Sequence, residues 1–155
     1  MPSRNLEKAM HILEAGDSLT NEYGVSYRLE EKLGKGSQAV VWRATRQHDQ
    51  QQVAVKLLID RDLMSAKAHH REMMLTAHKQ EAQLGQAFGA SPHFVDVYEL
   101  FQDSETGRLV LVMELIEGVE LMELFAKHRK HHKDFYFPWT FVLTLGVQVL
   151  EGLEQ

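Results

Sequence analysis

Cysteine is absent from the 155 residues, and proline occurs only three times. Without cysteine the chain has no disulfide, no thiolate nucleophile and no zinc–thiolate site, which suits a reducing compartment. No apolar run approaches the roughly 18 residues that span a bilayer, and residues 1–8 lack the apolar stretch of a secretion signal. We therefore expect a soluble, cytoplasmic protein with no membrane partner.

An excess of charge of one sign is also missing. The 17 Lys and Arg residues face 22 Asp and Glu residues, so the formal net charge is only −5. This balance gives no bulk electrostatic reason to bind nucleic acid. An apolar fraction of 44% with 25% charged residues is typical of a globular chain that buries a core.

The order of predicted elements indicates an α+β fold. Strand patterns cover 27–33, 40–44, 52–58, 94–101 and 109–115, and helical patterns cover 4–15, 66–88, 120–128 and the segment from Pro138 to the C-terminus. We expect an N-terminal extension with a short helix over 1–24, a sheet-based lobe over 25–116, and the exit and first helices of a second lobe over 117–155.

A glycine-containing turn separates the first two predicted strands. Gly34 and Gly36 lead into strand-forming sequence rather than a helix, which argues against a dinucleotide-binding loop, and position 29 lacks the glycine of a P-loop. Lys56, two strands away, can lie beneath the turn. Glycines that let backbone N–H groups approach phosphate, next to a lysine, would make an anion clamp; a plain hairpin turn is the alternative.

These residues resemble two motifs of the protein kinase family. The segment from Leu33 to Val41 looks like the glycine-rich loop, and the one from Val53 to Lys56 looks like the strand-three lysine motif. The resemblance implies that Lys56 contacts the α- and β-phosphates of ATP, under an adenine roof formed by Val41 and Ala54. The loop would contribute Leu33, Gly34, Gly36, Ser37 and Ala39 to the site. Ala39 replaces the third glycine, so we expect a stiffer loop.

The family holds this lysine with a glutamate from a helix, and two glutamates are candidates. Glu72 and Glu81 fall on opposite faces of a straight helix, at roughly 100° per residue. Glu81 shares its face with the set Met74, Ala77, His78 and Leu84, which is more apolar than the set around Glu72. We therefore predict a Lys56–Glu81 pair. Gly85 stands where the family carries a bulky apolar residue, so either Leu84 replaces it or the helix is more mobile.

The apolar segment 111–116 passes abruptly into an acidic turn containing Gly118. A buried strand with its exit loop would explain this pattern. It also resembles the kinase hinge, which implies that Met113 is the gatekeeper behind adenine. The Glu114 carbonyl and the Ile116 N–H would then bind adenine, and Glu120 would accept hydrogen bonds from the ribose.

The resemblance covers residues 27–155 and implies a parent enzyme that transfers phosphate from ATP to serine or threonine of proteins. The catalytic loop and the Asp-Phe-Gly motif that binds Mg²⁺ are absent from these residues. We expect the magnesium ligands to lie outside this chain, and the chain itself to be inactive. A pseudokinase interaction module with a vestigial nucleotide site is the alternative, and small-molecule and sugar kinases stay open.

Nine histidines and one basic run need a separate explanation. His128, His131 and His132 share a helical spacing, and His69, His70 and His78 fall in the long helix, but no cysteine or carboxylate cluster accompanies them. We expect solvated helix faces and no metal site. The basic run 127–133 is typical of a solvated linker, and docking of an acidic or phosphorylated partner is the alternative.

The last predicted helix carries an apolar face that in the family packs on the large lobe, which leads us to expect self-association. Its members are Phe141, Val142, Leu145, Val149, Leu150 and Leu153. Sedimentation at high protein concentration should show dimers or larger species, and a strictly monomeric chain would contradict the prediction.

Overall fold

The structure is a computed structural model that describes residues 12–36, 39–58, 68–89, 91–131 and 136–154. Its elements in chain order are β1 (Ser18–Thr20), β2 (Ser26–Lys35), β3 (Ala39–Arg46), β4 (Gln51–Leu58), α3 (Ala68–Phe88), β5 (Val97–Gln102), β6 (Leu109–Glu114), α4 (Leu121–His131) and α5 (Trp139–Leu153). The predicted α+β class is confirmed.

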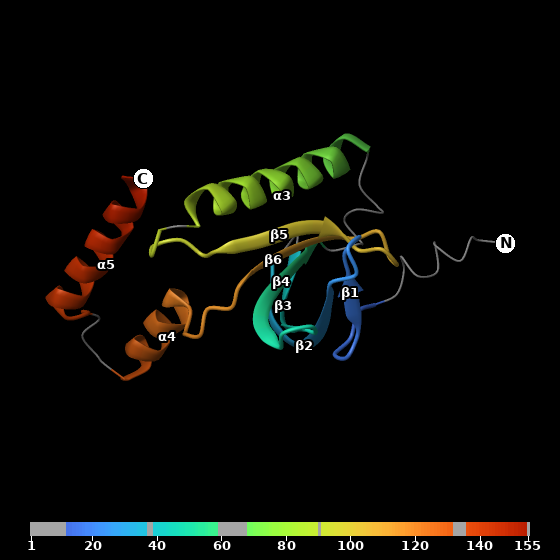
Figure 1. Cartoon of the computed structure of the whole chain (residues 1–155). Coiled ribbons are helices and arrows are strands. Elements are labelled where there is room, and N and C mark those ends of the chain that lie inside the picture. Colours follow the sequence, from blue (N-terminus) through green and yellow to red (C-terminus); the bar gives the residue numbers. More distant parts are fainter. Residues whose placement is uncertain (1–11, 37–38, 59–67, 90, 132–135, 155) are drawn as a thin grey trace.

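The strands form one six-stranded sheet in the order β1-β2-β3-β4-β6-β5, with every neighbouring pair antiparallel. Helix α3 runs along β5, whereas α4 and α5 lie beyond one end of the sheet (Figure 1). The prediction counted five strands and missed β1. Three residues are too short to show an alternating pattern, and pairing with β2 defines this strand instead.

The helix predicted over 4–15 is only partly covered by the structure. Residues 1–11 lie outside the described residues, and Ile12–Glu14 are not helical, so the prediction is wrong for its last turn. The Asp17 carboxylate accepts a hydrogen bond from the Glu14 N–H at 2.8 Å, and the Gly16 N–H donates to the Leu29 carbonyl at 2.8 Å. These bonds turn the chain toward β1.

The core lies on one face of the sheet. Strand β4 presents Val53, Val55 and Leu57 to it, and the paired strand β6 adds Val110 and Val112. The rest of the buried cluster is Leu19, Tyr27, Leu29, Trp42, Ala44 and Phe101. Burying such side chains contributes about 1.5–3 kcal/mol each, so this face fixes the register of the strands.

Helix α3 packs mainly on β5 and also contacts β6. Gly85 approaches the sheet closely, because a Cβ added there would lie 2.2 Å from Cγ2 of Val97. Leu84, predicted on the inner face, is 58% exposed. It therefore does not replace the bulky residue expected at position 85; Val97 of β5 fills that space instead. The helix backbone rests directly on the sheet because residue 85 has no side chain.

Helices α4 and α5 are joined through aromatic stacking. Phe137, between the helices, stacks on Phe141 and on His128, with centroids 5.1 and 4.3 Å apart, and it also packs against Phe125. Part of the predicted basic linker is helical, because α4 continues to His131, so the linker prediction is wrong for residues 127–131. Residues 132–135 lie outside the described residues.

The far end of α5 contacts the segment between α3 and β5. Gly152 is buried, and a Cβ added there would lie 3.3 Å from Cβ of His93. The His93 imidazole Nε2 lies 3.3 Å from Oε2 of Glu151. The α5 side chains Val142, Val149, Leu150 and Leu153 are exposed. None of the helices in the described part of the chain is long and apolar enough to cross a bilayer.

The contact between Gly85 and Val97 predicts that Gly85→Ala is destabilising. The added methyl group must displace Val97 or the helix, and such overpacking costs about 1–3 kcal/mol. Urea denaturation should show a lower midpoint. Gly146→Ala on α5 is the matched control, because a Cβ there meets nothing within 4 Å among the described residues, and it should gain about 0.5–1 kcal/mol from helix propensity.

A second substitution separates overpacking from other effects. Val97→Ala removes the atoms that the new methyl group would meet, so the double variant should be less destabilised than the sum of the single changes. Strict additivity of the two losses would contradict the contact.

Candidate functional site

Lys56 stands on a strand that is buried on both faces. In β4 the side chains alternate, with Val53, Val55 and Leu57 in the core and Ala54, Lys56 and Leu58 on the opposite face. Strand register extends this second face. Val41 of β3 and Leu111 of β6 pair directly with Lys56, and Met113 pairs with Ala54. The only partly exposed position in the middle of β4 is therefore the lysine.

Glu81 comes to this face from α3. The helix buries Met74, His78 and Ala82 against the sheet, which brings Glu81 to the edge of the buried face. Its carboxylate oxygens Oε1 and Oε2 lie 2.6 and 2.7 Å from Nζ of Lys56. Glu72 is exposed, as expected for the opposite face. The predicted Lys56–Glu81 pair is present as a two-oxygen ion pair.

His78 lies next to this ion pair and is buried. Only 3% of the residue is exposed, and its Nδ1 lies 3.7 Å from Oε2 of Glu81. Burial lowers the pKa of His78 below its ordinary value of 6.5; the charge of Lys56 adds to this effect, and that of Glu81 opposes it. The expectation of solvated histidine faces is therefore wrong for His78. Its i,i+3 spacing from Glu81 was the available signal, because it places both side chains on one face.

The turn between β2 and β3 closes through a hydrogen bond from the Gly36 N–H to the Ala39 carbonyl at 2.8 Å. Gly34 pairs with Val41, next to a register shift after Lys32. A Cβ added at Gly34 would meet nothing within 4 Å among the described residues. Ser37, predicted as part of the loop, lies outside the described residues. Leu33 is exposed just before the turn.

The chain leaves the sheet at the end of β6. The Glu114 N–H donates to the Asp96 carbonyl at 2.8 Å, and no regular element covers the next residues. Ile116 is exposed, and no hydrogen bond between described residues uses its N–H. The Glu120 carbonyl accepts a hydrogen bond from the Leu124 N–H at 2.9 Å, which opens α4, and its side chain is exposed.

The sheet thus gathers several of the predicted residues on one face, and other predicted residues flank it. Register joins Val41, Ala54, Lys56 and Met113, and the helix adds Glu81. Ala39 pairs with Leu58 near the turn. Glu114, Ile116 and Glu120 follow one another along the exit from β6, and the ion pair of Lys56 among the described residues is with Glu81.

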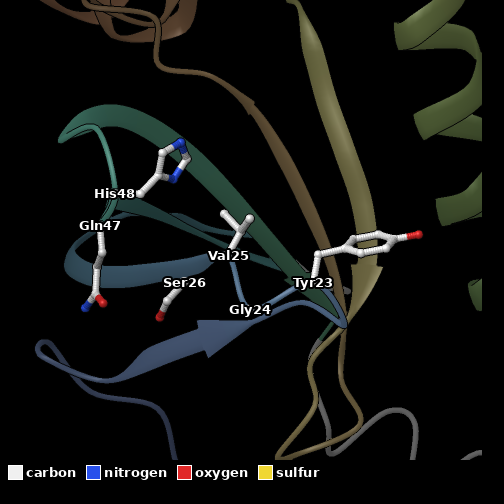
Figure 2. A pocket seen from close by; sticks show the side chains of 6 residues that line it. All are labelled: Tyr23, Gly24, Val25, Ser26, Gln47 and His48. Carbon is white, nitrogen blue, oxygen red and sulfur yellow. The ribbon is translucent and has the colours of Figure 1, made fainter.

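A shallow hollow of about 380 Å³ opens at the other end of the sheet (Figure 2). It is lined by Tyr23, Gly24, Val25, Ser26, Gln47 and His48. Ser26 begins β2 and Gln47 follows β3, so the hollow lies far along the strands from the glycine turn. Figure 2 shows the Tyr23 ring directed away from the His48 ring. Without a convergent set of charged groups, the hollow makes no site.

Metal binding has no support in the described part of the chain. No group of three or more His, Asp or Glu side chains there could hold an ion. Four of the described histidines have other surroundings: His48 lies beside Asp49, His78 is buried beside Glu81, His93 faces Glu151, and His128 stacks on Phe137.

A family profile described as protein kinase domain matches residues 27–155. The calcium-dependent protein kinase 5 of Plasmodium falciparum is 28% identical over 117 residues, which are 76% of this chain and 18% of that protein. The serine/threonine-protein kinase PKH3 of Eremothecium gossypii is 31% identical over 104 residues, which are 66% of this chain and 13% of that protein. The chain therefore spans less than a fifth of either relative.

The fold also matches a solved structure. The kinase domain of Mycobacterium tuberculosis PknI, crystallised as a double mutant, superposes with a TM-score of 0.66 over 92% of this chain and 49% of that chain. The sequences are 18% identical, so this likeness concerns the fold alone.

The exposure of the ion pair predicts that it adds little to stability. The side chains of Lys56 and Glu81 are 25% and 47% exposed, and partly exposed pairs contribute about 0–1 kcal/mol. Lys56→Met should therefore change the free energy of unfolding by no more than about 1 kcal/mol in urea denaturation. Lys127→Met, which breaks the exposed pair with Glu123, is the control. A loss several times larger for Lys56→Met would show that the pair is mainly structural.

Proposed function

The chain belongs to the protein kinase domain family, and from this premise we propose that its sheet and α3 form the ATP-binding side of a kinase nucleotide site. The observation that carries this proposal is the ion pair between Lys56 and Glu81. It holds an ammonium group at a fixed position on the outer face of β4. A lysine on a flexible stem would otherwise spend most of its time in water.

The ammonium has bonding capacity left for a phosphate. Its Nζ carries three N–H donors, and the two close contacts to Glu81 use two of them at most. A quarter of the Lys56 side chain is exposed, so the remaining donor is accessible. Because we expect the pair to contribute little to folding, we propose that its position serves to hold a fixed charge for the α- and β-phosphates of ATP.

The glycine turn supports the phosphate assignment. The space beside Gly34 is open among the described residues, and the Gly36 backbone is tied across the turn to Ala39. Neither glycine has a positive φ, so backbone strain does not account for the choice of residue. Open space for a ligand near the backbone explains the choice of glycine, because N–H groups can then approach phosphate oxygens without a side chain between them.

The adenine ring would lie against the apolar part of the same face. Met113 pairs with Ala54 there, and Val41 pairs with Lys56, two residues further along the same face of β4. Leu33 and Ala39 lie at the turn. Ala54 contributes only a methyl group to this face. At the exit from β6, the Glu114 carbonyl would accept from adenine and the exposed Ile116 N–H would donate to it. The Glu120 carboxylate would accept from the ribose hydroxyls.

Magnesium enters this proposal only with the nucleotide. No metal-holding group of side chains is present among the described residues. When bound, Mg²⁺ would neutralise phosphate charge. The described residues bind the nucleotide and orient its phosphates.

For the whole protein we propose transfer of the γ-phosphate of ATP to serine or threonine of a protein substrate, in the cytoplasm. The sequence likeness to a serine/threonine-protein kinase supports the acceptor class. Ala39 favours the second candidate, a pseudokinase interaction module, because an alanine at the third glycine position stiffens the turn. The two candidates differ in whether nucleotide binds.

Nucleotide binding is tested by thermal unfolding of the chain with and without Mg-ATP. A nucleotide that binds only the folded chain stabilises it by RT ln(1 + L/Kd), where L is the free nucleotide concentration, so the melting temperature rises with nucleotide concentration and with affinity. Lys56→Met removes a charged hydrogen bond worth about 1.5–3 kcal/mol, so the affinity should fall about 10- to 100-fold. Lys127→Met is the matched control and should leave binding unchanged. No stabilisation of the unaltered chain at millimolar Mg-ATP would contradict the proposal and favour the interaction module.

A further inference from the structure

His78 is a buried polar group to which the proposed nucleotide site assigns no role. It lies one helical turn before Glu81, and its ring is enclosed between α3 and the sheet, with 3% of the residue exposed. Its Nδ1 faces Oε2 of Glu81 at 3.7 Å, whereas Nε2 has no hydrogen-bond partner among the described residues. An enclosed imidazole beside a half-exposed carboxylate calls for a physical explanation.

We propose that His78 is a positioning residue: its neutral ring holds the Glu81 carboxylate against Lys56, and protonation of the ring loosens that ion pair. The inference deepens the proposed function and rests on it, since the pair is the part of the site that would orient the phosphates. His78 itself makes no contact with the nucleotide.

The geometry gives the neutral ring one preferred tautomer. A lone pair on Nδ1 would face the negative Oε2 of Glu81, which is unfavourable, so the proton belongs on Nδ1. The ring then directs an N–H toward the carboxylate from the buried side, while Lys56 approaches both oxygens at 2.6 and 2.7 Å. Between these two groups the carboxylate has less freedom to turn outward, although 47% of the side chain is exposed.

A second proton gives the His78 ring a positive charge. It would sit on Nε2, which makes no hydrogen bond within normal geometry among the described residues. The Lys56 backbone lies close enough to favour the charged ring, but burial outweighs it. The charged ring would also compete with Lys56 for Oε2 and repel the ammonium. The facing charges are Glu81 on α3 and Lys56 on β4. On β5 and β6, Glu99 is engaged with Asn21 and Tyr27, and Glu114 accepts from the Asp96 N–H.

The pH dependence follows from the lowered pKa of His78, which burial causes. The folded chain takes up this proton less readily than the unfolded chain. The stability that His78 contributes is therefore fully present above about pH 6.5 and is lost as the pH falls through the folded pKa. The ion pair should weaken over the same acidic range.

The first arm of the test needs no nucleotide. Proton–nitrogen NMR titration of the full chain reports the tautomer and the pKa of each histidine. Lys56→Met removes a repelling cation and should raise the pKa of His78, and Glu81→Gln removes an attracting anion and should lower it. His48, exposed beside Asp49, is the internal control and should respond to neither. An unchanged His78 titration in both variants overturns the inference.

The second arm measures Mg-ATP affinity at pH 7.5 and 5.8. His78→Asn keeps an N–H near the place of Nδ1 but cannot gain a proton. Because ATP itself titrates near pH 6, the informative quantity is the affinity of the unaltered chain divided by that of the variant. This ratio should fall as the pH drops through the folded pKa of His78, by about twofold where half of the rings are protonated, and it should stay constant for His48→Asn. A constant ratio for His78→Asn counts against the inference.

The NMR arm and the affinity arm distinguish failure of the His78 inference from failure of the proposed nucleotide site. Absence of Mg-ATP binding at both pH values overturns the proposed nucleotide site, and the NMR arm then decides the His78 inference alone. If His78→Asn does not fold, Lys56→Met and Glu81→Gln still give the titration result. Nucleotide binding with no coupling of His78 to Lys56 or Glu81 keeps the proposed function and removes the inference.

Discussion

The arrangement of the site depends on one contact between the sheet and the helix, the ion pair of Lys56 with Glu81. Helix α3 is otherwise attached through apolar contacts to β5 and β6, and one of these is the close approach of Gly85 to Val97. Glu81 and Gly85 are four residues apart, so both contacts lie on one side of the helix, one turn apart. The apolar contact sets the distance of α3 from the sheet, and the ionic contact depends on the rotation of α3 about its own axis. Because a partly exposed pair is weak, a small change in α3 is enough to break it.

Much of this could be predicted from the sequence, and the reasons are local. Lys56 interrupts an apolar strand, and the alternation of side chains places it on the face opposite the core. Glu81 and Glu72 lie on opposite sides of the helix, so only one of them can face the sheet. Both arguments need only helix and strand periodicity. The parts that failed depend on partners distant in sequence. Strand β1 exists because β2 pairs with it, and Gly85 is needed because Val97, on another element, occupies the space.

The position of α5 likewise could not be predicted from the sequence pattern alone. Its apolar residues gave a correct expectation of a helix, but periodicity alone did not indicate where it is attached. The attachment is made by Gly152, whose missing side chain lets the helix approach His93, beside the contact of His93 with Glu151. In both α3 and α5 a glycine permits a close contact, and in both cases the reason lies in the residue opposite. A glycine within a predicted helix therefore indicates a contact without identifying its partner.

His78 shows how a residue can be placed correctly and still be misinterpreted. Its spacing from Glu81 predicted a shared face, whereas its residue type suggested solvent. In the structure the helix face decides, because Met74 and Ala82, one turn away on either side, are buried on the same face as His78. A leucine at that position would fill the space and leave Glu81 without a polar neighbour on its buried side. A histidine there costs desolvation and leaves Nε2 without a partner among the described residues. That cost is understandable if the ring acts on the carboxylate beside it. A group that only filled space would not need a nitrogen facing Glu81.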